Sequence, residues 1–237
     1  PLRLPFQVHL VALAVATVLV LSLPETIIQR SRRPLSLRLE IPPAERDVFW
    51  KILVPSGMLF SLFDGVALSL VPVFLVRNVG VENYALVGAS GFLVLFSGAV
   101  AQAVLNRVPP QPAIAGGLTV AAVASLGVVL SAPAGSVALT LVSVAVTGGA
   151  AGMVFKGGAD LVTLIAPPED RGKLFSAYYV ACYLGGFSVP LLVIGVLSDL
   201  IGLTLALLFL SVAAALGAAW TWAVGLRSLD RLGPTGR

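Results

Sequence analysis

Apolar residues occur in long runs along this chain, and short groups of polar, proline and glycine residues separate the runs. A helix needs about 20 mostly apolar residues to cross a hydrocarbon core of about 30 Å. Prolines in such helices are tolerated, so those inside the second and sixth runs predict kinks rather than ends. The pattern predicts seven membrane-spanning helices, at residues 4–23, 52–76, 84–105, 112–131, 137–160, 174–197 and 203–226.

The composition supports a membrane environment. Hydrophobic residues make up 58% of the chain and charged residues 11%, whereas a soluble domain carries roughly 25% charged residues. So few polar side chains cannot cover the surface of a soluble fold of this size. The first run lacks the basic front and small-residue cleavage site of a signal peptide, so we interpret it as a retained span. The single cysteine, Cys182, cannot form an internal disulfide.

Basic residues alternate between the connections and predict the orientation. The connections after the first, third, fifth and seventh runs carry twelve of the 15 lysines and arginines. The opposite side has only Arg3 and Arg77, and Lys156 lies inside a run. By the positive-inside rule, the twelve-charge side and the C-terminus are cytoplasmic in a cell membrane. The amino end would then lie outside without a signal, which we expect of a truncated chain.

One connection, residues 25–51, is long, polar and rich in proline and arginine. It predicts a hinge between two helical bundles. We therefore divide the chain into the last helix of a first bundle at residues 1–24, a cytoplasmic loop at 25–51, a six-helix bundle at 52–227 and a cytoplasmic tail at 228–237.

Three short motifs carry a family resemblance. Pro24, Glu25 and Thr26 precede the basic cluster that begins at Arg30; a second motif, with Glu169 and Arg171, spans residues 167–172; a third, with Gly185, Gly186 and Pro190, spans 183–190. Together with the span pattern they resemble the major facilitator superfamily, in particular a drug-efflux-like bacterial member. Residues 106–110 depart from that pattern, because Arg107 alone remains of the family's glycine-aspartate-arginine loop.

The resemblance implies an all-α integral membrane bundle in which the seven spans are helices six to twelve of twelve. It also implies a secondary active transporter that works by alternating access and needs a small-molecule substrate, the bilayer and the missing N-terminal bundle as partners. Few polar groups lie in the spans, which favours proton-coupled efflux of an amphipathic compound. Uptake of a small metabolite or sugar, and a seven-helix receptor outside the transporter class, are the alternatives.

Asp64 is the strongest candidate for chemistry. It lies near the middle of the second span, and a charged group there costs roughly 2.5 to 3.5 kcal/mol on insertion scales. We favour the hypothesis that it faces the central cavity and binds a cationic or hydroxylated substrate or takes up a coupling proton. The alternative is a protonated aspartate that is hydrogen-bonded to a neighbouring helix.

Lys156 and Asp160 lie four residues apart and can pair on one helix face. As a functional pair they would line the cavity opposite Asp64, with Lys156 in reach of its carboxylate. As a structural pair they would lie at the end of the span, with Lys156 extending to the interface, and we favour this interpretation.

Glycines and the remaining polar residues complete the analysis. Gly148 and Gly152 have the spacing of a close helix contact. No phosphate-binding loop, catalytic serine–histidine pair or zinc motif is present in the sequence. One histidine, His9, cannot build a metal site, and Asp199 lies at a span end. The sequence therefore predicts no enzyme, no cofactor and no nucleic-acid partner.

Overall fold

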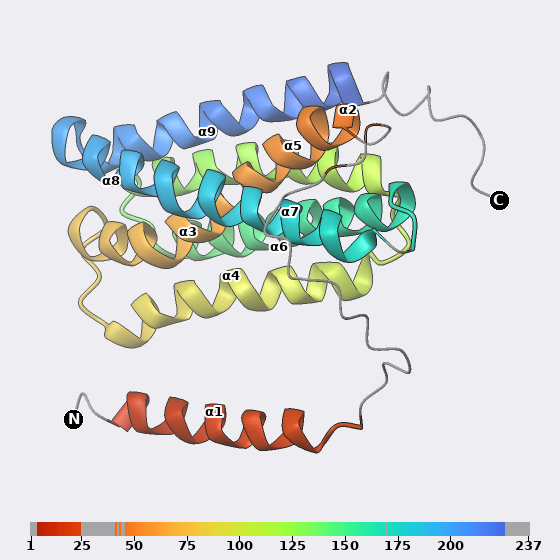
Figure 1. The fold of residues 1–237 in the computed structure, drawn as a ribbon. Coiled ribbons are helices and arrows are strands. Elements are labelled where there is room, and N and C mark those ends of the chain that lie inside the picture. The colour runs from red at the N-terminus through yellow and green to blue at the C-terminus, as the bar shows by residue number, and fades with distance from the viewer. Residues whose placement is uncertain (1–3, 25–40, 42, 44–45, 169, 226–237) are drawn as a thin grey trace. The chain divides into compact units, whose positions relative to one another are not determined.

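The computed structural model describes residues 4–24, 41, 43, 46–168 and 170–225. The chain divides into two compact units, Pro1–Arg38 and Leu39–Arg237. The described part of the first unit is one helix, α1 (Leu4–Ser22). The second unit is a bundle of long helices that run alongside one another (Figure 1), so the all-helical prediction is confirmed. Its elements are α2 (Arg46–Val48), η1 (Phe49–Leu53), α3 (Val54–Arg77), α4 (Tyr84–Val104), α5 (Pro110–Ser131), α6 (Val137–Ile165), α7 (Arg171–Cys182), η2 (Tyr183–Ser188), α8 (Val189–Ile201), α9 (Leu203–Trp220) and η3 (Thr221–Gly225).

Within the described residues, six continuous helical segments are long and apolar enough to cross a membrane, and all six belong to the second unit. The remaining predicted span, the first one at residues 4–23, corresponds to α1, which runs from Leu4 to Ser22 and so ends one residue before the predicted end. Pro24 follows, and a proline disfavours helical backbone at the residue before it.

Helix α6 also departs from its predicted bounds. It continues to Ile165, five residues past the predicted end at Asp160. The apolar residues after Asp160 extend the helix, and Pro167 follows its end. At 1.5 Å per residue its 29 residues span roughly 43 Å, longer than a hydrocarbon core of about 30 Å.

Three of the described membrane helices contain a widened, π-helical turn, η1, η2 and η3, and the first two of these turns lie just before a proline. In a regular helix each proline would clash with the carbonyl four residues earlier and leave it without a donor. Element η1 precedes Pro55, and η2 precedes Pro190, so the chain accommodates both rings by widening the turn. Trp220 of α9 then donates its indole N–H to the carbonyl of Lys51, four residues before Pro55, at 2.9 Å.

The connections at one end of the bundle are tight turns. Each contains one glycine with a positive φ: Gly80 (79°), Gly135 (58°) and Gly202 (88°). Only glycine adopts this backbone readily. Two of the helices that follow are capped: Asn83 accepts from the backbone N–H of Ala85, and Ser136 accepts from that of Leu139. At this end of the six-helix unit the helices are therefore joined by short connections, and two of the helix N-termini have a side-chain cap.

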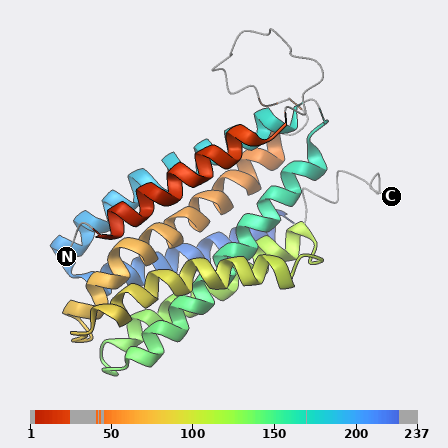
Figure 2. The ribbon, with the colours of Figure 1, turned by 90° about the horizontal axis from the view of Figure 1, so that it is seen from below.

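The six spans form two sets of three, α3 to α5 and α6 to α9, and the sets interlock. The second helix of the first set, α4, packs mainly on the first helix of the other set, α6. Likewise the continuous segment α7, η2 and α8 packs on α3, while the third helices, α5 and α9, pack on each other. Figure 2 shows this bundle from a second direction. Neither set of three can bury its helices without the other.

Glycines allow a close approach in two of these contacts, the crossing of α4 with α6 and the crossing of η2 with α3. A Cβ on Gly152 of α6 would meet the Gly98 carbonyl oxygen of α4 at 2.5 Å, and one on Gly148 would meet the Val94 Cα at 2.6 Å. Small residues let helix backbones approach in this way.

The second crossing joins η2 to α3. A Cβ on Gly185 would lie 2.6 Å from the Met58 Cγ, and one on Gly186 would lie 2.8 Å from the Ser61 Cβ. Pro190 follows in the first turn of α8. The glycines and the proline of this motif therefore shape the contact between α3 and the segment that runs from α7 to α8.

Candidate functional site

Asp64 lies in the middle of α3, ten residues after its first residue and thirteen before its last. At 1.5 Å per residue these separations are about 15 and 20 Å. The side chain is partly buried. Among the residues that the structure describes, none forms a hydrogen bond or an ion pair with its carboxylate. An unpaired carboxylate in the middle of an apolar membrane helix is costly, so its presence calls for a functional explanation.

A row of aromatic rings links α3, α6 and the α7–η2 segment. The Phe60 ring lies 5.0 Å from the ring of Phe155, which lies 6.0 Å from that of Tyr179. The row continues to Tyr183 at 6.4 Å and then to Phe187 at 6.3 Å. Tyr183 is 59% exposed and Tyr179 40% exposed, so the described chain leaves this part of the bundle surface open.

Both ends of this aromatic row come back to α3 next to Asp64. Phe60 precedes Asp64 by one turn, and Phe187 lies 3.2 Å from where a Cβ on Gly65 would stand. Since a helix turns about 100° per residue, Phe60 points about 40° to one side of Asp64 and Gly65 about 100° to the other. The carboxylate therefore leaves α3 between the two ends of the row.

This arrangement has the chemistry of a site for a cation or a proton. A carboxylate supplies the charge, and aromatic faces attract cations by roughly 0.5 to 2 kcal/mol, more as water is excluded. The apolar faces of the rings are also suited to contact the apolar part of an amphipathic molecule. The tyrosine hydroxyls of Tyr179 and Tyr183 can donate to it or accept from it.

Lys156 does not take part in this arrangement. Its ammonium group donates to the carboxylate of Asp160 and to the carbonyl oxygen of Val108 at 3.1 Å. Its side chain is 12% exposed, whereas that of Asp160 is 45% exposed. Phe155, the preceding residue, faces α3, so Lys156 points about 100° away from that direction. The structure therefore does not bring Lys156 close to Asp64. Instead, the hydrogen bond from Lys156 to Val108 attaches α6 to the connection between α4 and α5.

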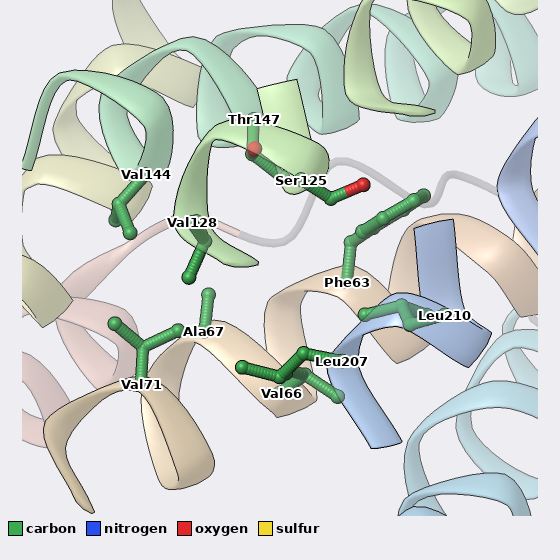
Figure 3. Close-up of a pocket in the computed structure, with 10 residues that line it drawn as sticks. All are labelled: Phe63, Val66, Ala67, Val71, Ser125, Val128, Val144, Thr147, Leu207 and Leu210. Carbon is green, nitrogen blue, oxygen red and sulfur yellow. The ribbon is translucent and has the colours of Figure 1, made fainter. Parts of the chain in front are cut away.

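The interior of the bundle holds a separate small cavity. Its volume is about 20 Å³, room for about one water molecule. Figure 3 shows Phe63, Val66, Ala67 and Val71 from α3 facing Ser125 and Thr147 across it. Both hydroxyls donate to carbonyls of their own helices, and Asp64 is not part of the lining. We interpret this cavity as a packing defect rather than a ligand site.

The loop residues that the sequence singled out have simpler surroundings. Arg107 is exposed in the connection between α4 and α5. Arg171 donates to the carbonyl oxygen of Ala166 at 3.4 Å and so links the start of α7 to the end of α6. Glu25, Arg30 and Glu169 lie outside the described residues.

Two more polar residues from the sequence analysis are not members of the aromatic row. Asp199 is exposed near the end of α8, and His9 is exposed on α1, in the other unit. In the described ranges, no group of three or more histidine, cysteine, aspartate or glutamate side chains could hold a metal ion.

The aromatic row is the part of the site that the sequence analysis missed. Tyr179, Tyr183 and Phe187 recur every four residues, which places them along one face of a helix. That spacing was visible in the sequence, but the contribution of Phe60 and Phe155 depends on how α3 and α6 pack.

A comparison with protein families identifies the family of this chain. A family model described as Major Facilitator Superfamily matches residues 2–190, which are 189 of the 237 residues. No curated protein matches the chain at a significant level. The matched range includes α3, α6, α7 and η2, the elements that carry Asp64 and the aromatic row.

Proposed function

The chain belongs to the major facilitator superfamily and is a membrane transporter, and we propose that it is a secondary active transporter of the drug-efflux type, which exports an amphipathic compound in exchange for protons. Transporters of this class are built from repeated sets of helices, and they expose a midplane site alternately to the two sides of the membrane. Asp64 lies at that depth. Its unpaired carboxylate beside the aromatic row is the observation that carries this proposal.

The interlocked helix sets support an assignment of the bundles. Inverted sets of three helices form each half of a transporter of this superfamily, and the six spans from α3 to α9 divide into two sets of three. We assign this unit as the C-terminal bundle and α1 as the last helix of the N-terminal bundle. On this assignment the open face beside Asp64 is the part of the unit that we propose to contact the substrate.

The distribution of charge supports an orientation in the cell membrane. Arg107, Arg171 and Lys173 lie in or beside the connections at one end of the second unit. Under the positive-inside rule that end faces the cytoplasm. The C-terminus would lie on the same side, because α9 runs back to this end, where Trp220 bonds to Lys51.

In this mechanism Asp64 holds either a proton or the substrate cation, but not both. A proton entering from outside neutralises the carboxylate, weakens its attraction for the cation and releases the compound. After the site reopens to the cytoplasm, the proton leaves and the carboxylate binds the next molecule. The aromatic row contacts the apolar part of the compound in either state.

The test is transport by the complete protein in vesicles of bacterial-type phospholipids with an imposed pH gradient. A fluorescent amphipathic cation serves as the probe. Asp64→Asn should abolish export driven by the gradient, because the amide can neither carry the proton nor offer a negative charge. Asp199→Asn, which changes an exposed aspartate at a helix end, is the matched control and should transport normally. Unchanged export by Asp64→Asn across the pH range would refute the proposal.

The tyrosines give a second readout. Tyr183→Ala should raise the KM for the cation more than it lowers kcat, since it removes a contact made with bound substrate. Tyr183→Phe keeps the ring and should stay close to the parent protein. Equal losses in both variants would mean that the ring face does not bind the substrate.

A further inference from the structure

A second, larger hollow lies on a different side of the six-helix unit. It is a groove of about 410 Å³ between α4 and α5, with α6 as its floor. Every lining residue is apolar, and the wall includes Ala101, Leu105, Val108, Gly116, Val146 and Met153. It has no residue in common with the aromatic row or with the interior cavity. Asp64 plays no part in it.

The length of the groove along the helices matches the thickness of one leaflet of a bilayer. One end of the groove lies at Val108, whose carbonyl oxygen accepts a hydrogen bond from Lys156 of α6. Val146, at the other end, is ten residues earlier on α6, or about 15 Å along the helix axis. Half of a hydrocarbon core is also about 15 Å. With Lys156 taken as the level of the membrane interface, the groove runs from there to the midplane.

Internal packing does not explain why the groove stays open. A Cβ on Gly117 would meet the Ala150 carbonyl oxygen at 2.8 Å, so that glycine allows α5 to approach α6. A Cβ on the adjacent Gly116 would meet nothing within 4 Å. A larger side chain at residue 116 would fit within the fold and fill part of the groove. The missing side chain at Gly116 therefore leaves space for a molecule from outside the fold.

A positive charge stands at the interfacial end. Arg107 is exposed, and it lies in the loop between Leu105 and Val108, both of which line the groove. In the described chain it has no hydrogen bond or ion pair. The nearby charge of Lys156 is already paired with Asp160. Among the described basic residues next to the groove, Arg107 is the one that remains to bind an anion.

We propose that this groove binds one acyl chain of an anionic phospholipid whose phosphate is bound by Arg107. The solvent around this part of the helices is lipid, and an acyl chain matches the length and the apolar lining of the groove. The guanidinium group suits the phosphate by charge and by its planar set of donors. This inference rests on the chain being a multi-pass membrane protein and does not depend on export or on Asp64.

The test uses the full chain in vesicles of palmitoyl-oleoyl phosphatidylcholine with a trace of spin-labelled lipid. The fraction of immobilised label is compared between phosphatidylglycerol and phosphatidylcholine probes. The parent protein should prefer the anionic probe about fivefold, the factor that one basic residue near a membrane surface contributes. Arg107→Gln should remove this preference. Arg77→Gln is the control: Arg77 is the last residue of α3, at the other end of the bundle from Arg107, and its variant should keep the preference.

Filling the groove tests the acyl-chain site independently. Gly116→Leu should lower the immobilised fraction of both probes. Gly88→Leu is the control, because a Cβ there also meets nothing within 4 Å but lies outside the groove. The proposal fails if Arg107→Gln retains the preference or if Gly116→Leu immobilises as much lipid as the parent. It also fails if the parent is a dimer and Gly116→Leu a monomer, since a second copy would then occupy the groove.

Discussion

Replacing Gly152 by alanine should weaken the packing of α4 on α6. The new Cβ would lie 2.5 Å from the carbonyl oxygen of Gly98 and 2.7 Å from its Cα, whereas ordinary contact begins at 3.4 Å. The helices must therefore separate by about 0.9 Å, the difference between 3.4 and 2.5 Å. Both contacts are with backbone, so no side chain can move aside. Overpacking of this kind costs roughly 1 to 3 kcal/mol.

The assay is equilibrium unfolding of the full chain in mixed micelles, followed by circular dichroism as the fraction of SDS rises. Alanine also favours helix over glycine by up to about 1 kcal/mol, so a control has to carry the same gain. Gly88→Ala on α4 does so, since a Cβ there meets nothing within 4 Å. The difference between the two variants isolates the steric cost. If Gly152→Ala proves as stable as Gly88→Ala, the close α4–α6 crossing is wrong.

Two further substitutions test the polar contacts that attach distant parts of the bundle. Trp220→Phe leaves the carbonyl of Lys51 without its donor and should lower the free energy of unfolding by about 0.5 to 1.5 kcal/mol in the same micelle assay; no loss would mean that the widened turn satisfies this carbonyl in another way. Lys156→Met keeps most of the apolar stem and removes the bond to the carbonyl of Val108, so amide hydrogen exchange in the connection between α4 and α5 should speed up. If exchange there is unchanged, Lys156 does not hold this connection.

The span pattern was largely visible in the sequence because bilayer thickness sets helix length and because glycine and proline mark the ends. The predicted end of α6 failed for a local reason, because apolar residues after Asp160 carry the helix to Ile165. The π-helical turns could not be foreseen, since a proline such as Pro190 can be accommodated by a kink or by a widened turn, and only the neighbouring helices decide which.

The candidate site was foreseen in part. An aspartate in the middle of an apolar run draws attention by its cost alone, and this is why Asp64 could be singled out. Its surroundings could not be foreseen, because the aromatic row joins residues from three helices whose packing no single run encodes. The same limit applies to Lys156, whose second acceptor is a backbone carbonyl at Val108, 48 residues away in sequence.

The packing of α3 explains why the carboxylate of Asp64 is left without a partner. One face of α3 enters the bundle core through Phe63 and its neighbours, and another lies against η2 through Gly65. Asp64 leaves the helix between these faces, where neither the core nor η2 supplies a donor. A structural aspartate would be expected to acquire a donor from one of its two neighbours, since an unpaired charge there is costly. The bundle instead leaves the carboxylate between the two ends of the aromatic row. Such surroundings suit the role that we propose, in which Asp64 exchanges a proton for a cation during each transport cycle.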